Sequence, residues 1–223
     1  ETGYTASQPA TGKTAYGVRI YDDRIGNMTD MVTFDPTNAS ILTPVMSMGN
    51  KYVSAGAFAN GKYYMALAEN TGGKDMPSNF FEVDLETMKP VRVGSLSGFE
   101  NAINDMSYDY SQGKLYAVAR LNNGNSALYI IDLTYAFSTK IVELDRHFYT
   151  LACSYGGQLY GVSRTGDFCK IDKATGTVDI IGPTTIAPSY NQSMEFDHSD
   201  KTLYWAVSAI NDETFMARID VES

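Results

Sequence analysis

The sequence predicts an all-β fold, a β-propeller of four-stranded antiparallel blades with five blades in all. Two short phrases that recur in phase support this prediction. The first phrase centres on a tyrosine that repeats 48, 52, 44 and 44 residues apart, at Tyr16, Tyr64, Tyr116, Tyr160 and Tyr204. The second is an apolar residue and then aspartate, 12 to 20 residues after each tyrosine, at Asp35, Asp84, Asp132, Asp172 and Asp220. This period is that of a propeller blade, whereas a β-helix turn is shorter and a sandwich has no reason to repeat.

Each repeat carries the signals of four strands, named A to D here in chain order. A hairpin signal such as Asn60-Gly61 precedes the tyrosine phrase, so strand A pairs with a strand B that contains the tyrosine. Strand C ends at the aspartate, and turn residues such as 173–176 separate it from an apolar strand D. Strands of the best-preserved repeat, at 115–119 and 127–131, are apolar on both faces, as stacked blades require.

The repeats at the two ends of the array are incomplete. The first has strands B, C and D without a convincing A, and the last stops at Ser223, where D would begin. One more strand D and one more strand A would close five blades without free edges, so we expect about twenty further native residues. A ring of more than five blades is the alternative interpretation. The expected organisation is a linker or cloning remnant over 1–12 and one propeller domain over 13–223, with blades near 14–50, 51–100, 101–147, 148–191 and 192–223.

The charge balance excludes two classes of partner. The chain has 17 Lys and Arg against 26 Asp and Glu, a formal net charge of −9. Nucleic acid is bound through its phosphates by a basic surface, and an anionic membrane attracts the same kind of surface. No apolar run approaches the roughly 18 residues of a membrane span, so we expect no nucleic-acid binding and no membrane insertion.

The repeated phrases resemble those of a known group of proteins. Gly-x-Leu-Tyr at 157–160 and apolar-Asp-x-x-Thr-Gly at 171–176 are similar to the blades of extracellular propellers of the quinoprotein, YVTN and NHL type. The Tyr- and Asn-rich composition resembles that of secreted Bacteroidetes surface proteins. The resemblance covers residues 14–220 and implies a propeller fold and a secreted or cell-surface bacterial location. It includes no quinone, metal or catalytic signature, so no cofactor is expected.

The two cysteines are expected to be buried free thiols. The hairpin at Gly156-Gly157 and the turn at Thr165-Gly166 place Cys153 on strand A and Cys169 on strand C of one blade, with strand B between them. Two strand spacings are nearly 10 Å, whereas a disulfide needs Cα atoms within about 7 Å.

Other residues with reactive side chains fit structural roles better than chemical ones. His147 and His198 are each isolated from other metal-ligating residues, so no metal site is expected. The segment 109–113 fits a hairpin turn capped by its aspartate, because it lacks the alternating acids of a calcium loop. The aspartate and tyrosine of every repeat fit turns and packing between blades, because an active site is single.

Loops that differ between repeats are the expected place for a ligand. In propellers the D–A and B–C loops emerge on one face around the channel, and here we expect polar B–C loops at 22–30, 69–79, 121–126 and 211–213. The D–A loops are expected at 145–147 and 188–191. The candidate binding residues at this channel mouth are Asn104, Asp105, Tyr149, Thr150, Gln192, Ser193, Arg146, His147 and Tyr190.

The pattern favours a non-catalytic binding or adhesion module that recognises a glycan or an extracellular protein at this rim. The alternative is a glycan-active enzyme, since five-bladed propellers host glycosidases with acids on their innermost strands. Such an enzyme needs two carboxyl groups about 5 to 9.5 Å apart. Asp105 is the one good channel candidate, and Glu195 is expected to point toward a neighbouring blade. A structural spacer within a larger surface protein is the third reading.

Overall fold

The computed structural model describes residues 12–22 and 28–221. Residues 1–11 of the linker expected at 1–12 and part of the loop expected at 22–30 therefore lie outside the described residues. The chain divides into two compact units, residues 1–50 and residues 51–223. The first unit is a three-stranded antiparallel sheet of β1 (Ala15–Asp22), β2 (Met28–Asp35) and β3 (Asn38–Gly49). An ion pair of 2.7 Å between Arg19 and Asp30 joins β1 to β2.

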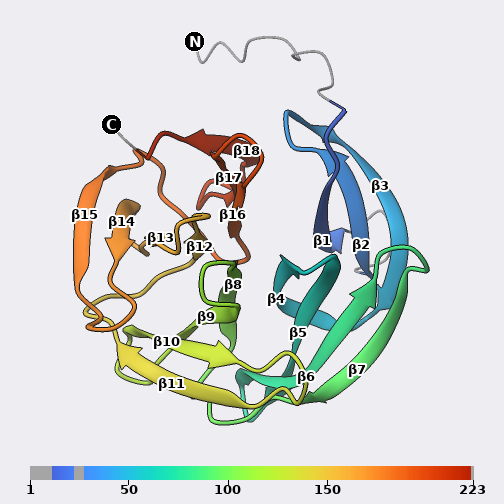
Figure 1. Cartoon of the computed structure of the whole chain (residues 1–223), viewed down its shortest axis with the longest axis horizontal. Coiled ribbons are helices and arrows are strands. Elements are labelled where there is room, and N and C mark those ends of the chain that lie inside the picture. Colours follow the sequence, from blue (N-terminus) through green and yellow to red (C-terminus); the bar gives the residue numbers. More distant parts are fainter. Residues whose placement is uncertain (1–11, 23–27, 222–223) are drawn as a thin grey trace. The chain divides into compact units, whose positions relative to one another are not determined.

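The second unit contains four antiparallel sheets, each made of strands that follow one another along the chain (Figure 1). The first sheet has β4 (Tyr52–Ala59), β5 (Lys62–Thr71), β6 (Lys74–Asp84) and β7 (Lys89–Ser95). The next has β8 (Ile103–Asp109), β9 (Lys114–Arg120), β10 (Ser126–Ile131) and β11 (Ser138–Glu143). The third has β12 (Ala152–Cys153), β13 (Leu159–Val162), β14 (Asp167–Ile171) and β15 (Val178–Pro183). The last has β16 (Ser193–Asp197), β17 (Thr202–Ser208) and β18 (Thr214–Ile219).

These five sheets confirm the predicted all-β fold of small antiparallel propeller blades. The strand count also agrees with the sequence, because the first sheet has strands B, C and D and the last has A, B and C. In the part of the chain that the structure describes there is no helix, and so none that could cross a membrane.

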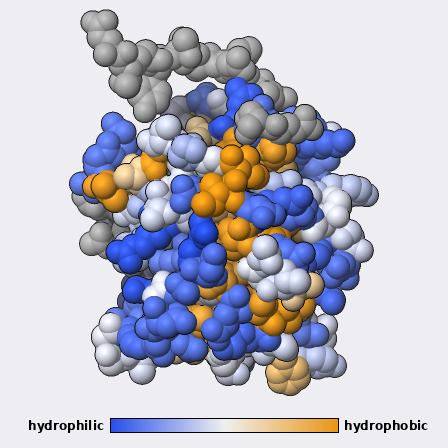
Figure 2. All heavy atoms as spheres, turned by 90° about the vertical axis from the view of Figure 1, so that its left-hand side faces the viewer, coloured by the Kyte–Doolittle hydropathy of each residue, from blue (hydrophilic) through white to orange (hydrophobic). Residues whose placement is uncertain are grey.

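The inner strand of each blade in the second unit contacts the inner strands of its neighbours. These strands are β4, β8, β12 and β16, and β8 contacts each of the other three (Figure 1). The outer strands β7, β11 and β15 expose much of their surface, and Figure 2 shows hydrophobic side chains scattered among hydrophilic ones on the side that carries β15. The blades therefore pack face to face around their A strands, with the D strands toward solvent.

Three hydrophobic clusters fill the spaces between successive blades of the second unit. The first joins the β4–β7 and β8–β11 blades and contains Phe80 and Tyr129. The second joins the β8–β11 and β12–β15 blades around Phe148, and the third joins the β12–β15 and β16–β18 blades around Trp205. Burial on both faces of the B and C strands explains why their sequences do not alternate between apolar and polar residues.

The repeated aspartate caps the turn after strand C, as the sequence predicts. Oδ1 of Asp84 accepts hydrogen bonds from the backbone N–H groups of Glu86 and Thr87 at 3.0 and 2.8 Å. Asp132 and Asp172 make the equivalent bonds in the next two blades. The hairpin at 109–113 is capped in the same way by Asp109. These bonds satisfy N–H groups that the turn leaves without a strand partner, and they explain the repetition.

The cysteine prediction is confirmed. Cys153 lies on β12 and Cys169 on β14 of the same blade, with β13 between them, and both are free and buried. Burial raises the pKa of the Cys153 thiol to about 12 and that of the Cys169 thiol to about 11. Neither thiol is reactive at neutral pH, because the nucleophilic form is the thiolate.

One expected loop is absent. Residues 69–79 continue strands β5 and β6, which are paired as far as Thr71 and Lys74. Gly72 and Gly73 form the two-residue connection with φ of 62° and 83°, the left-handed conformation that such a turn requires. The prediction of a long polar loop was wrong because polar residues on a two-stranded extension in solvent have the same composition as a loop.

Candidate functional site

The candidate site lies where two blades of the second unit bring their connections together. The connection from β11 to β12 carries His147 and Tyr149, and the turn from β13 to β14 carries Arg164. The backbone N–H of Tyr149 donates to the carbonyl of Val162 at 3.0 Å, and that of Arg164 donates to the carbonyl of His147 at 2.8 Å. These two bonds hold the D–A connection against the B–C turn of the same blade.

The next blade repeats this arrangement. The backbone N–H of Ser189 donates to the carbonyl of Ser208 at 2.7 Å, and that of Ile210 donates to the carbonyl of Ala187 at 3.0 Å. The D–A and B–C connections of both blades thus emerge at one end, as expected for a propeller. Backbone bonds at both connections fix the side chains between them before any ligand arrives.

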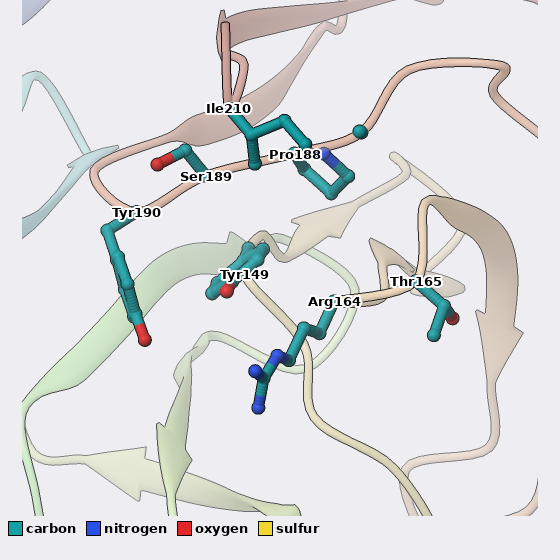
Figure 3. A pocket seen from close by; sticks show the side chains of 8 residues that line it. Tyr149, Arg164, Thr165, Pro188, Ser189, Tyr190 and Ile210 are labelled. Carbon is teal, nitrogen blue, oxygen red and sulfur yellow. The ribbon is translucent and has the colours of Figure 1, made fainter. Parts of the chain in front are cut away.

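A pocket of about 330 Å³ opens between these connections. Figure 3 shows Tyr149 between Tyr190 and Arg164, with the turn residues around them. The lining residues are Tyr149, Arg164, Thr165, Ala187, Pro188, Ser189, Tyr190 and Ile210. None of the eight carries a carboxyl group.

Two tyrosines form the aromatic part of the pocket. The rings of Tyr149 and Tyr190 meet edge to face, with centroids 5.4 Å apart and planes at 67°. Tyr149 is 5% exposed and Tyr190 is 55% exposed. Burial raises the pKa of Tyr149, and the neighbouring Tyr190 adds to that shift. The Tyr149 phenol therefore stays protonated at neutral pH, and the two tyrosines contribute hydroxyl groups and ring edges to the pocket.

His147 lies behind Tyr149, with ring centroids 4.9 Å apart. It is 5% exposed, and neither ring nitrogen has a hydrogen-bond partner among the described residues. Burial, together with the charges of Arg120 and Arg164, lowers the pKa of His147 to about 4. The ring is therefore neutral at physiological pH.

The inner strands hold a second polar group, centred on Asp105 of β8, which is fully buried. Its Oδ2 accepts hydrogen bonds from the backbone N–H groups of Leu151 at 2.9 Å and Met194 at 3.0 Å. Its Oδ1 accepts from the backbone N–H of Met106 at 3.0 Å and from the Ser193 hydroxyl at 2.9 Å. Burial raises the pKa of Asp105 to about 8 against the opposing effect of these bonds. One side chain thus connects three blades.

Glu195 of β16 points toward the β8 blade, as the sequence predicts. The Ser107 hydroxyl lies 2.9 Å from each of its carboxylate oxygens, and the backbone N–H of Phe196 donates to Oε1 at 2.9 Å. Burial raises the pKa of Glu195 to about 8, and repulsion from Asp105 adds to the shift. The two acids interact electrostatically, yet the hydrogen bonds described above tie both of them to the scaffold. Their arrangement therefore suits cross-linking of blades rather than attack on a substrate.

The structure separates the nine candidate residues into two groups. Tyr149 and Tyr190 line the pocket, and His147 packs behind Tyr149. Arg146 pairs with Asp145 at 2.9 Å and is not among the residues that line the pocket.

The remaining candidates bond to other parts of the protein. The Thr150 hydroxyl accepts a hydrogen bond from the N–H of Val162 at 2.9 Å, and Gln192 accepts one from Nε1 of Trp205 at 2.8 Å. Ser193 donates to Asp105, as described above. Asn104 is half-buried, and its Oδ1 has no partner among the described residues.

Sequence reasoning missed Arg164 and Thr165, which line the pocket from a short turn. The turn at 163–166 is closed by a bond from the N–H of Gly166 to the carbonyl of Ser163 at 2.9 Å. The sequence points to long polar B–C loops as binding sites, and this turn is too short to be counted among them. The Arg-Thr-Gly sequence at the end of an apolar strand was the available signal. No group of three or more potential metal ligands occurs within the described ranges.

Comparisons with known proteins bear on the fold. No protein-family model matches the chain, and no curated protein matches its sequence. A protein of unknown function from Bacteroides thetaiotaomicron is similar over 88% of this chain and 54% of its own length, with 12% identity and a TM-score of 0.54. The likeness is one of fold. A glucose dehydrogenase is similar over 93% of this chain and 78% of its own, with 9% identity and a TM-score of 0.58.

A third solved structure is an auxiliary nutrient binding protein from Bacteroides ovatus. It is similar over 72% of this chain and 35% of its own length, with 15% identity and a TM-score of 0.50. The chain therefore spans about half the length of the Bacteroides thetaiotaomicron protein and about a third of this one. At these identities the shared feature is the arrangement of strands.

Proposed function

We propose that the protein is a non-catalytic binding module that holds a glycan in the pocket between Tyr149, Arg164 and Tyr190. The observation that carries this proposal is a pocket of about 330 Å³ that combines two aromatic rings with hydroxyl groups and a guanidinium group. Aromatic edges and faces contact the C–H groups of a sugar ring, and the polar groups bond to its hydroxyls.

The size of the pocket favours a glycan over a folded protein. Small-molecule sites occupy roughly 300 to 1,000 Å³, and this pocket falls at the lower end of that range. A stable protein interface instead buries about 800 Å² on each partner over a broad surface. A short saccharide fills the volume between the two connections, and its ends can continue into solvent.

The glycan-active alternative has weaker support. Carboxylate-dependent cleavage needs two acids at the ligand, and the eight residues that line the pocket include none. Asp105 and Glu195 are bonded to the scaffold by their carboxylate oxygens. An enzyme using them would have to break the bonds that connect the blades.

We also propose that the module acts outside the bacterial cytoplasm, as part of a secreted or cell-surface adhesion or nutrient-capture protein of the quinoprotein, YVTN and NHL propeller type. Support comes from the Tyr- and Asn-rich sequence, and the fold is shared with a protein described as an auxiliary nutrient binding protein. A glycan is a ligand that such a location supplies.

A glycan array followed by calorimetric titration tests the proposal. Tyr190→Ala is expected to weaken binding of the best array ligand about tenfold, because one aromatic contact contributes of the order of 1 kcal/mol. Tyr135→Ala is the matched control, since Tyr135 is 64% exposed and does not line the pocket. The proposal would be contradicted if no glycan on the array bound, or if the two variants lost the same affinity. If the same surface captured a protein, that protein would be the ligand in place of a glycan.

A further inference from the structure

We propose that this pocket selects acidic saccharides, which carry a carboxylate or a sulfate ester, over neutral ones. The inference rests on the proposed glycan-binding function and adds the class of ligand. It comes from Arg164 of the β13–β14 turn, which lines the pocket, and from Arg120 at the end of β9, whose charge acts on the same aromatic residues.

The two arginines share their neighbours. The charges of both act on His147 and on Tyr149, where they lower the pKa of each group. Arg164 belongs to the wall of the pocket and is exposed there (Figure 3).

Neither arginine has a carboxylate partner among the residues that the structure describes. Elsewhere the chain pairs several of its cations with acids, at Arg19–Asp30, Lys62–Glu82, Lys140–Glu143, Arg146–Asp145 and Lys173–Asp109. With 26 acids against 17 cations, acidic partners are abundant in the sequence. Arg164, which lies in the wall of the pocket without such a partner, therefore marks a place where a ligand can supply the negative charge, and Arg120 adds a second positive charge near the same aromatic residues.

Asp167, which follows Arg164 in the same connection, does not act as the negatively charged partner of Arg164. Asp167 accepts a hydrogen bond from the Thr165 hydroxyl at 2.7 Å, and its charge acts on Arg146. His147 adds no negative charge, because the ring is buried, neutral and without hydrogen-bond partners. The guanidinium group of Arg164 is left for a carboxylate or a sulfate ester, two of whose oxygens it can bind with two parallel N–H donors.

The opposite wall suits the remainder of a sugar. Ser189 and Tyr190 place hydroxyl groups across the pocket from Arg164, and Ile210 supplies an apolar surface that is 70% exposed. One end of the pocket is thus cationic and the other offers hydroxyl and apolar contacts. A saccharide with an acidic group at one edge of the ring matches both ends.

Calorimetric titration of the full chain with matched oligosaccharides tests the inference. The probes are a uronic-acid oligosaccharide, a sulfated one, their neutral counterpart, and inorganic sulfate alone. We expect at least one acidic form to bind about tenfold more tightly than the neutral form, and its advantage to shrink in 0.5 M KCl, because an exposed pair is screened. Whichever acidic form binds better identifies the anion, and inorganic sulfate should bind far more weakly than the saccharides.

Arg164→Gln should reduce binding of the acidic form to the level of the neutral form. Arg92→Gln is the matched control, since Arg92 lies on the outer strand β7 and bonds to Asn79. Neutral and acidic forms binding equally, without an effect of salt or of Arg164→Gln, would overturn the selectivity and leave glycan binding in place. Failure of all the saccharides to bind would overturn both proposals, and equal binding of inorganic sulfate would reduce the site to one for simple anions.

Discussion

Stability should fall as pH rises through neutrality, and Asp105 should cause about half of that fall. The pKa of Asp105 is raised from its usual value of 3.8 to about 8, and that of Glu195 from 4.5 to about 8, both because the groups are buried. A raised folded-state pKa means that the folded protein holds a proton that the unfolded chain has lost. The resulting stabilisation is complete below the unfolded value and is lost as pH approaches 8.

The size of the effect follows from linkage. One pKa unit corresponds to about 1.4 kcal/mol, and between pH 7 and pH 8 each of the two carboxyls lowers the free energy of unfolding by about 1 kcal/mol. His147 and His198 contribute little in this window, because both have lowered pKa values and the unfolded histidines are already mostly neutral. The wild-type protein should lose about 2 kcal/mol over this one pH unit.

Asp105→Asn isolates the contribution of Asp105 to the loss of stability between pH 7 and pH 8. The amide oxygen can keep the two bonds that Oδ2 accepts from Leu151 and Met194, whereas the amide nitrogen faces the N–H of Met106. The Ser193 hydroxyl, which donates to Oδ1 in the wild type, can turn to accept a bond from the amide nitrogen, so only the bond from Met106 is lost. That lost bond and the buried donor left unpaired should cost about 1 to 3 kcal/mol at pH 7. The loss between pH 7 and pH 8 should shrink to about 1 kcal/mol, from Glu195 alone.

Urea denaturation at pH 7.0, 7.5 and 8.0, followed by circular dichroism, measures both quantities. A wild-type stability that is constant or rises over this range would refute the raised pKa values. A variant with the same pH dependence as the wild type would show that Asp105 is not one of the titrating groups.

Two further predictions concern packing and charge in the blades. Gly161→Ala should lower the free energy of unfolding by about 1 to 3 kcal/mol, and with it the melting temperature, because the added Cβ would lie 2.7 Å from a backbone oxygen. Gly182→Ala is the control, since its Cβ would enter open space, and its melting temperature should stay close to that of the wild type. Lys173→Met should lower the free energy of unfolding, measured by urea denaturation, by about 2 kcal/mol, since it removes the ion pair of the fully buried Asp109 carboxylate. Lys62→Met, which removes a partly exposed ion pair with Glu82, should change little, and equal effects of the two variants would contradict this reasoning.

The repeat made the architecture predictable, because the same residues recur wherever each blade needs a turn or a packed face. Asp84 and Asp172 cap equivalent turns, and Tyr160 stacks against Phe168 and Phe196 between two blades. Periodicity of this kind carries information about structure that no single residue carries.

The site was less predictable, because its residues come from positions where the blades differ. Tyr149 and Tyr190 could be placed at the rim from the order of strands alone. Arg164 lies in a short turn without unusual composition, and only the neighbouring D–A connections show that it faces a pocket. Asp105 lies buried on the inner strand β8, and its backbone partners on two other blades depend on spatial register, which the sequence does not specify.

The central claim is that a glycan binds between the β12–β15 and β16–β18 blades, and Ile210 offers the most direct measurement. With isoleucine δ1 methyl groups labelled, addition of the best-binding acidic oligosaccharide should shift the NMR resonance of Ile210, which lines the pocket and is 70% exposed. Ile180, which is 54% exposed on the outer strand β15, should not move. Saturable binding that leaves Ile210 unshifted, or that shifts Ile180 instead, would contradict the account.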